Sequence, residues 1–206
     1  MNSNGGGESN GSGESNGTGT RERILTAAAA LFRRQGYTGT GLKQIAAESR
    51  ARVGSIYHFF DGKDALTEEV VRTGGAAYGA MVLALLDGGP DDPVDALGAA
   101  FEQAAVDIAL TDYADACPIA TVALEVASTN EPLRQATADV FASWLDVLAA
   151  WCRVVVDDPD SARDLATAVV CALEGAFVLA RAMRDPEPIL AAGRSVTLLA
   201  AAMRDG

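Results

Sequence analysis

Two short amphipathic segments, joined by a turn, constrain the fold of this chain more than any other feature. Apolar residues recur at helical spacing from Leu42 to Ala46 and again from Val53 to Phe60. This spacing places apolar side chains on one face of a helix. The five residues 48–52 between the segments leave no room for a strand. Two short helices joined by a tight turn form a helix-turn-helix, whose second helix can enter the major groove of DNA.

The remainder of the chain predicts an all-α protein. Apolar residues make up 49% of the 206 residues, and the alternation typical of strands is absent. We expect a three-helix helix-turn-helix domain over residues 20–66 and a larger helical domain over residues 67–206, with about nine helices in all. Residues 1–19 contain no large apolar residue after Met1, so they are expected to form a disordered tail.

Charge is distributed unevenly along the chain. The net charge is −12, which by itself argues against nucleic acid as a partner. However, residues 21–66 carry eight basic and four acidic residues, a balance of +4, whereas the rest of the chain carries 8 basic and 24 acidic residues, a balance of −16. A basic end on an acidic body suits a protein that touches DNA with one end only. The alternative is a basic patch that arose by chance.

The second amphipathic segment contains a specific motif. Residues 54–60 read Gly-Ser-Ile-Tyr-His-Phe-Phe, and Gly-Lys-Asp-Ala-Leu follows at residues 62–66. Together with the Ile-Ala pair at residues 45–46, this run resembles the DNA-binding domain of TetR-family transcriptional regulators, and the resemblance covers residues 21–66. It implies contacts with DNA for Thr20, Arg21, Thr40, Lys43, Arg50, Arg52, Val53, Gly54, Ser55, Tyr57, His58 and Lys63.

The turn of the motif departs from the family pattern. The family uses Ala-Gly-Val-Ser, in which Gly favours a positive φ and Ser caps the second helix. Residues 49–52 read Ser-Arg-Ala-Arg, and the Arg52 side chain cannot accept a hydrogen bond as an N-cap. Either the second helix starts differently, or Arg50 and Arg52 serve DNA phosphates. The second helix itself carries no Arg or Asn for a bidentate base contact, so these arginines could also supply sequence readout.

Helical spacing also assigns neighbouring residues. Thr20 is expected to cap the first helix, which ends at Gly36. In the second helix of the motif, Ile56 and Phe60 are expected to point inward. Tyr57 either contacts the DNA backbone, as the resemblance implies, or packs as an aromatic residue of the small domain.

A long helix is expected over residues 64–86, with glycines inside it at Gly74, Gly75 and Gly79. Each glycine costs roughly 1 kcal/mol relative to Ala in a helix interior. In TetR-like proteins this helix links the ligand domain to the DNA-binding domain. The glycines therefore mark either a pliable hinge or small-residue packing.

The larger domain carries candidate ligand-binding residues. The Cys-Pro-Ile-Ala…Ala-Leu-Glu stretch at residues 117–125 resembles the LmrA/YxaF-type branch of the TetR family. Glu125 is a lone acid in an apolar helix, so it either faces solvent at one edge or lines a cavity. Aromatic walls suit an apolar ligand pocket, although the same residues can form ordinary core. The candidates are Phe101, Cys117, Glu125, Phe141, Trp144 and Trp151.

The last two helices are expected at residues 161–184 and 188–204, and they are dense in Ala, Val and Leu with few charges. The resemblance implies that they pair with those of a second copy in a two-fold, four-helix interface. The alternative is that they cap the ligand domain within one chain, and both arrangements can hold at once.

Other functional classes find little support. His58 is the only histidine, and no Ser-His-Asp order, phosphate loop or metal constellation is present, so neither an enzyme nor a bound cofactor is expected. Cys117, Cys152 and Cys171 lie in apolar helical contexts without a signal peptide, which suggests reduced, buried thiols in a cytoplasmic protein. No apolar run reaches transmembrane length without polar interruption, so no membrane contact is expected.

Together these observations predict a ligand-responsive, homodimeric transcriptional repressor. It would bind a pseudo-palindromic operator in double-stranded DNA and be released by a small apolar or aromatic effector. The second hypothesis is a helical, dimeric ligand-binding or scaffold protein whose DNA-binding head is degenerate.

Overall fold

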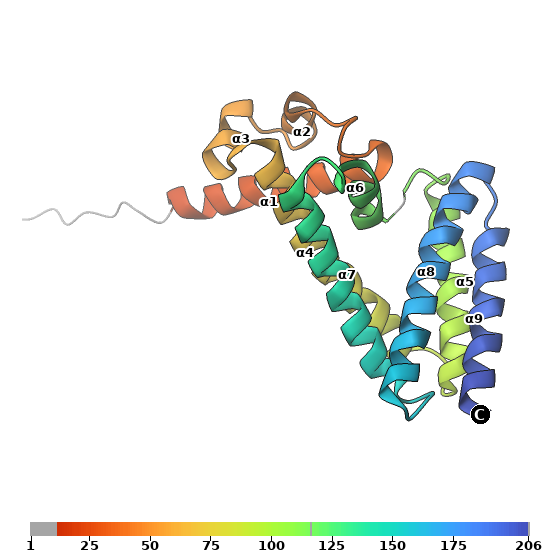
Figure 1. Cartoon of the computed structure of the whole chain (residues 1–206). Helices are drawn as coiled ribbons and strands as arrows, with labels where there is room; N and C mark the ends of the chain where they lie inside the picture. The colour runs from red at the N-terminus through yellow and green to blue at the C-terminus, as the bar shows by residue number, and fades with distance from the viewer. Residues whose placement is uncertain (1–11, 116, 206) are drawn as a thin grey trace, which may run out of the picture.

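A computed structural model describes residues 12–115 and 117–205, with the backbone alone for residues 12–18. Within these residues the chain forms nine helices and no strands, as the sequence predicts (Figure 1). The helices are α1 (Ser12–Gln35), α2 (Leu42–Glu48), α3 (Val53–Phe59), α4 (Gly62–Asp87), α5 (Pro93–Leu110), α6 (Pro118–Val126), α7 (Glu131–Cys152), α8 (Pro159–Met183) and α9 (Glu187–Asp205).

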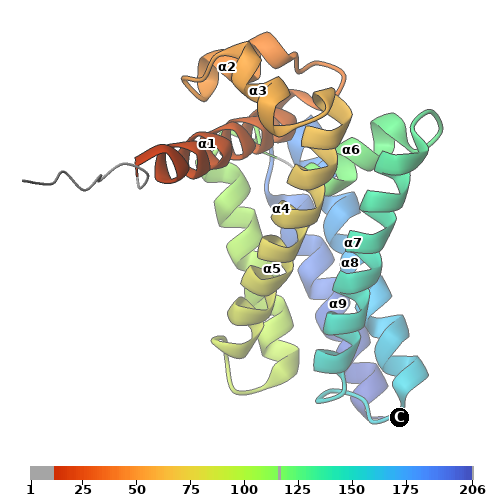
Figure 2. The same ribbon diagram turned by 90° about the vertical axis from the view of Figure 1, so that its left-hand side faces the viewer.

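Helices α1–α3 and the start of α4, up to Val70, form a small unit that we call the head. In Figure 2, α2 and α3 lie above α1 and the upper end of α4. Side chains with 0% exposure from all four helices meet at its centre, namely Ile24, Phe32, Ile45, Ile56 and Leu66. Phe60 is also buried in this cluster. The prediction that Ile56 and Phe60 point inward is therefore confirmed.

Helix α1 begins earlier than the sequence predicts. It starts at Ser12, so Thr20 lies within the helix and is not its N-cap, and residues 12–19 are helical where a disordered tail is expected. The remainder of that expected tail, residues 1–11, lies outside the described residues. The physical reason is that a helix, once nucleated by packing, extends at little cost per residue. Arg23 supports the extension, since its guanidinium donates to the Gly19 carbonyl and the Thr20 hydroxyl.

Helices α4 and α7 pack closely, and two of the three glycines in α4 explain why. A Cβ at Gly75 would lie 2.4 Å from Val140 Cγ1, and one at Gly79 would lie 2.9 Å from Trp144 Cδ1. A Cβ at Gly74 would meet nothing within 4 Å. Small-residue packing therefore accounts for Gly75 and Gly79, and the hinge interpretation is not needed for them.

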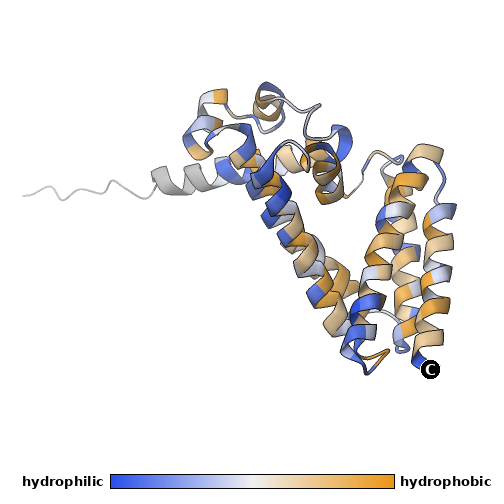
Figure 3. Cartoon of the chain, viewed as in Figure 1, coloured by the Kyte–Doolittle hydropathy of each residue, from blue (hydrophilic) through white to orange (hydrophobic). Residues whose placement is uncertain are grey.

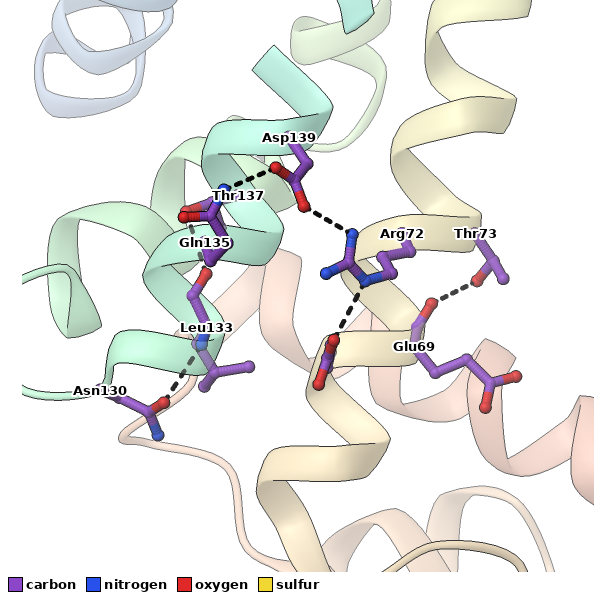
Figure 4. A network of polar contacts seen from close by, with 9 residues as sticks. Glu69, Arg72, Thr73, Asn130, Leu133, Gln135, Thr137 and Asp139 are labelled. Atoms are coloured by element: carbon purple, nitrogen blue, oxygen red, sulfur yellow. Dashed lines mark hydrogen bonds and ion pairs between the residues drawn. The ribbon is translucent and has the colours of Figure 1, made fainter. Parts of the chain in front are cut away.

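A polar network on the surface joins the same two helices (Figure 4). Arg72 of α4 donates to Asp139 Oδ2 of α7 at 2.9 Å and to Glu68 Oε1 at 3.1 Å. Gln135 donates to the other carboxylate oxygen of Asp139 at 2.7 Å. These exposed bonds orient α4 relative to α7 but stabilise the fold only slightly, because surface ion pairs contribute only about 0–1 kcal/mol.

The helices α5, α8 and α9 form the other half of the molecule, and α8 also packs on α7. Figure 3 shows hydrophobic residues along most of these three helices. Four helices begin with a side-chain cap and a proline in the first turn: Asp92 accepts from Val94 N, Cys117 from Ala120 N, Asn130 from Leu133 N, and Asp158 from Ser161 N. Such caps satisfy otherwise unpaired amides, and proline at the first helical position lacks the amide that would need a partner.

Two helices are long and apolar enough to cross a membrane by length and composition alone, contrary to the expectation from the sequence. They are α4 and α8. Within the fold, α4 packs on α1, α5 and α7, and α8 packs on α7 and α9. Packing against these neighbouring helices therefore explains why α4 and α8 are apolar.

Candidate DNA interface and effector cavity

Helix α3 presents its polar face to solvent. Gly54, Tyr57 and His58 are exposed, and Tyr57 has 62% of its surface accessible. Val53 and Ser55 at the start of the helix are partly exposed. The exposure of Tyr57 excludes the alternative that it is a packed aromatic residue of the head. The predicted groove-facing residues therefore share one accessible surface.

The turn before α3 has an unusual backbone. Arg50 adopts φ 53°, the left-handed conformation for which the family uses Gly, and Arg52 is the N-cap of α3 without a side-chain cap bond. Helix α3 nevertheless starts at Val53, as predicted, so the alternative that the helix starts differently does not hold. Lys43, Arg50 and Arg52 are all exposed near α3. The arrangement leaves three basic side chains available to an anionic partner.

Of the two threonines in the predicted interface, Thr40 does not fit a DNA contact, and Thr20 is partly exposed. Thr40 has 1% exposure, and its hydroxyl donates to the Gly36 carbonyl at 2.7 Å. This prediction is wrong because the hydroxyl stabilises the loop between α1 and α2 and has no accessible surface. Thr20 lies inside α1, where its hydroxyl accepts from Arg23 at 3.0 Å.

Two basic residues of the predicted interface are engaged within the head. Arg21 forms an ion pair with Glu69 of α4 and lies over the ring of Phe60. The Lys63 ammonium donates to the Tyr37 carbonyl at 2.6 Å and lies 3.9 Å from the centroid of that ring. Burial lowers the pKa of Lys63, while nearby carboxylates oppose that shift. Both side chains brace α4 against α1 and the loop that follows it.

Glu125 is partly exposed and does not line either of the two cavities described next, so the cavity alternative from the sequence does not hold. Its carboxylate accepts from the backbone amides of Tyr37 at 3.2 Å and Thr38 at 2.6 Å. Gly36 makes room for it, because a Cβ at this position, where φ is 77°, would lie 1.8 Å from Glu125 Oε1. Glu125 therefore ties α6 to the loop between α1 and α2 of the head.

A cavity of ≈ 470 Å³ lies between the head and the larger helical domain. Six helices contribute to its wall, for example through Arg33 of α1, Tyr78 of α4, Phe101 of α5, Pro118 of α6, Leu148 of α7 and Phe177 of α8. Cys117, which precedes α6, also lines it. The structure thus brings together two of the predicted ligand-binding residues, Phe101 and Cys117.

A second cavity of ≈ 280 Å³ adjoins the first and is lined by α4, α7 and α8. The two share five lining residues: Tyr78, Val82, Leu148, Val169 and Leu173. Trp144 lines the smaller cavity, and its indole N–H donates to the Gly75 carbonyl at 2.8 Å. The prediction of an aromatic wall therefore applies to Trp144.

The other three predicted ligand-binding residues line neither cavity. Phe141 packs edge-on against Trp144, with ring centroids 5.5 Å apart. Trp151 lies farther along α7, where its indole N–H donates to Asp87 at 3.2 Å. Glu125 is held at the head, as described above. The common reason is that helical spacing identifies a face but not which part of that face meets a void.

Sequence reasoning missed several polar residues of the cavities, among them Tyr78 and Glu174. Burial raises the pKa of the Tyr78 hydroxyl, of the Glu174 carboxyl and of the Cys117 thiol. Glu174 directly follows the run Val-Val-Cys-Ala-Leu in α8, so it is an acid within an apolar stretch just as Glu125 is. The reasoning applied to Glu125 would have found it. Among the described residues, no group of three or more His, Cys, Asp or Glu could hold a metal ion.

Comparison with known protein families agrees with this geometry. A model described as "Bacterial regulatory proteins, tetR family" matches residues 24–70, and one described as "Transcriptional regulator LmrA/YxaF-like, C-terminal domain" matches residues 93–195. The uncharacterised HTH-type transcriptional regulator YxaF of Bacillus subtilis (strain 168) is 34% identical over 181 residues, which cover 87% of this chain and 94% of YxaF. The chain belongs to the TetR family of transcriptional regulators.

Other TetR-family proteins extend the comparison. The HTH-type transcriptional regulator LmrA of the same organism is 32% identical, over 83% of this chain and 91% of LmrA. Among solved structures, regulatory protein TetR from Rhodobacter sphaeroides has the same fold, with a TM-score of 0.78 at 21% identity, covering 86% of this chain and 97% of that chain. The relatives are transcriptional regulators, a non-enzymatic family, and TetR-family regulators are soluble proteins that bind DNA.

Helices α8 and α9 of this TetR-family chain carry an apolar surface that the other described residues leave uncovered. Leu179 and Met183 of α8 are 54% and 62% exposed. Cys171 is exposed on the same helix, so the expectation of three buried thiols holds only for Cys117 and Cys152. A shallow groove between the two helices is lined by Cys171, Gly175, Leu179 and Met183 together with residues of α9.

Proposed function

We propose that this TetR-family regulator is a cytoplasmic, homodimeric repressor that binds a pseudo-palindromic operator. A small apolar or aromatic effector binds in the adjoining cavities and releases the protein from DNA. Residues 20–66 serve as the DNA-binding domain, and residues 67–206 serve as the effector-binding and dimerisation domain.

One observation supports this proposal most strongly: α1 and α4 belong to the head and also line the larger cavity. Ala29 and Arg33 reach the cavity from α1, and Gly74 and Tyr78 reach it from α4. A ligand that fits one arrangement of these helices better than another shifts the population toward that arrangement. Because the same helices carry α2 and α3, the spacing of two heads in a dimer changes with the ligand. By linkage, DNA weakens effector binding by the same factor.

The surface of the head supports DNA as the partner. Lys43, Arg50 and Arg52 are exposed beside α3, whose first residues can enter a major groove. In a two-fold dimer, two α3 helices meet successive major grooves of a pseudo-palindromic site. Tyr57 and His58 are exposed on α3, which allows them to contact phosphates or base edges, and Ser55 can bond to either a donor or an acceptor.

The apolar surface of α8 and α9 supports dimerisation. Leu179 and Met183 remain open to water in the single chain although both are large and apolar. Contiguous apolar surface of this kind marks an interaction site. Pairing with the same surface of a second copy gives an isologous interface, which is the commonest form of homodimer.

The deciding experiment is a fluorescence-anisotropy titration of the full chain with DNA from upstream of its own gene, at low and moderate salt. We expect saturable binding that exceeds binding to random DNA. The logarithm of the affinity should fall with the logarithm of the salt concentration, by about 0.9 for each phosphate neutralised. Binding no stronger than to random DNA, across a panel of neighbouring intergenic regions, would favour a ligand-binding protein with a degenerate head.

A further inference from the structure

A single carboxylate lines the smaller cavity. Glu174 of α8 is placed there with Tyr78 of α4 and Trp144 of α7. Apart from Ser143 of α7, the other side chains of this wall are apolar: Ala76, Ala80, Val82, Leu83, Val147, Leu148, Val169, Val170 and Leu173. In the part of the chain that the structure describes, no Lys, Arg or His forms an ion pair with Glu174. Its hydrogen-bonding neighbour is the thiol of Cys117.

Such a carboxylate is poorly satisfied by the protein alone. Moving a carboxylate out of water is unfavourable unless a cation or several hydrogen bonds compensate. A thiol is a weak donor and supplies little compensation. Burial accordingly raises the pKa of Glu174, and the thiol opposes this only in part. A cation beside Glu174 would supply the compensation that the protein lacks.

The aromatic residues beside Glu174 favour a cation as well. The ring centroids of Tyr78 and Trp144 lie 5.1 Å apart, with an interplanar angle of 43°. The faces of such rings attract cations through their quadrupoles. The indole N–H of Trp144 is committed to the Gly75 carbonyl, so this residue does not offer it to an anionic ligand.

The adjoining cavity provides space for an apolar group. Its wall includes Phe101, Phe177 and Met81. The basic residue in that wall, Arg33, is paired with Asp115 at 3.2 Å, so its charge is balanced locally. A ligand can therefore place its charge in the smaller cavity and its apolar part in the larger one.

We propose that the effector is an amphipathic organic cation, a substituted ammonium ion that carries an apolar group. The ammonium lies beside the Glu174 carboxylate and the rings of Tyr78 and Trp144, and the apolar group extends into the larger cavity. This inference rests on the proposed function and specifies the chemical class of its ligand.

A matched pair of probes tests the charge directly. Benzyldimethyl(2-hydroxyethyl)ammonium is the cation, and 3,3-dimethyl-4-phenylbutan-1-ol has the same shape with carbon in place of nitrogen. The chain has two tryptophans, so Trp151→Phe leaves Trp144 as the only indole reporter. Titration of this variant is followed by Trp144 fluorescence, without DNA. We expect the cation to bind at least ten times more tightly than the neutral probe.

Variants then assign the preference to Glu174. In the Trp151→Phe background, Glu174→Gln keeps the shape and removes the charge, and should bring the two affinities within about a factor of two. Glu102→Gln is the matched control, because Glu102 is exposed on α5 and lines neither cavity. It should leave the preference unchanged. Circular dichroism confirms that each variant is folded.

Three results would overturn the inference: equal affinity for both probes, no saturable binding of the cation, or an unchanged preference in Glu174→Gln. Because binding is measured without DNA, this test is independent of the proposed function. A Glu174-dependent preference in a protein that binds no operator would support the cation site and contradict the repressor. Operator binding without any preference for the cation would support the repressor and contradict the cation site.

Discussion

At the scale of single residues, the backbone of Arg50 gives the first prediction. A non-glycine residue in the left-handed region costs about 1 kcal/mol or more, and Arg50 has φ 53°. Arg50→Gly removes that cost but increases the entropy of the unfolded chain, so we expect the free energy of unfolding to rise by up to about 1 kcal/mol. Urea denaturation measures the change.

The neighbouring arginine is the matched control for this prediction. Arg52→Gly removes the same charge, but φ of Arg52 is −87°, so no strain is relieved. Arg52→Gly should either leave the free energy of unfolding unchanged or lower it. If both variants are destabilised equally, the backbone of Arg50 is not strained. In DNA titrations each variant should reduce the slope of the logarithm of the affinity against the logarithm of the salt concentration. The reduction should correspond to about one phosphate contact, because each variant loses one cation.

Glu174 gives a pH-dependent prediction with a definite sign. Its folded-state pKa is raised above the usual 4.5, chiefly by burial. Between pH 4.5 and the folded-state pKa, the folded protein therefore holds a proton that the unfolded chain has largely released, so stability falls as the pH rises through this range. Glu174→Gln should remove this loss, so its stability advantage over the wild type should grow with pH. Thermal unfolding of both proteins between pH 5 and pH 8 measures the difference. A constant difference would mean that burial does not perturb the carboxyl.

At the scale of helices, the crossing of α4 and α7 predicts opposite effects for two adjacent glycines. A Cβ at Gly75 would overlap the Val140 side chain, and overpacking of this kind costs roughly 1–3 kcal/mol. A Cβ at Gly74 meets nothing within 4 Å, so Gly74→Ala should instead stabilise by up to about 1 kcal/mol through helix propensity. Chemical denaturation of the two variants compares them directly. Equal effects would show that α4 and α7 do not approach closely at Gly75.

The contact between α6 and the head gives a further prediction. Glu125 accepts two backbone amides of the loop between α1 and α2, and hydrogen bonds to a charged group contribute about 1.5–3 kcal/mol. Glu125→Gln keeps the size of the side chain but can offer only one good acceptor oxygen. We expect the free energy of unfolding to fall by roughly 1–2 kcal/mol. Glu102→Gln on the exposed face of α5 should change it little. Similar stability of the two variants would rule out a stabilising contact at Glu125.

The sequence predicts helices well where local signals are strong. The bounds of α2 and α3 follow from their apolar period and the turn between them, and Pro93 marks the start of α5. Local signals fail for α1, because the sequence favours a start at Thr20 whereas the helix extends back to Ser12. They also fail for Lys63, because its bond to the Tyr37 carbonyl depends on how α4 and the loop meet in three dimensions.

At the scale of the whole molecule, the sequence predicts an apolar cavity with aromatic lining but does not predict which residues line it. Phe101, Cys117 and Trp144 line the cavities, because large or sulfur-containing apolar residues line voids as readily as they fill cores. Phe141 and Trp151 share a helix with Trp144, but only Trp144 faces the gap between α4 and α8. Where two helices diverge depends on the packing of all the others, so no local pattern predicts it.

The last prediction concerns the dimer and the DNA it binds. Leu179 lies in the groove between α8 and α9 with 54% exposure, so Leu179→Glu places a charge at the centre of the proposed interface. A single head contacts half of a pseudo-palindromic site, and loss of bivalency lowers the affinity by roughly 10²-fold or more. We therefore expect the variant to sediment as a monomer and to lose operator binding to that extent, while its cavities still bind ligand. Leu124→Glu is the control, because Leu124 is 80% exposed on α6, away from this groove. A Leu179→Glu protein that remains dimeric would place the interface elsewhere on the surface, and one that binds the operator fully as a monomer would contradict the two-fold mode of DNA binding.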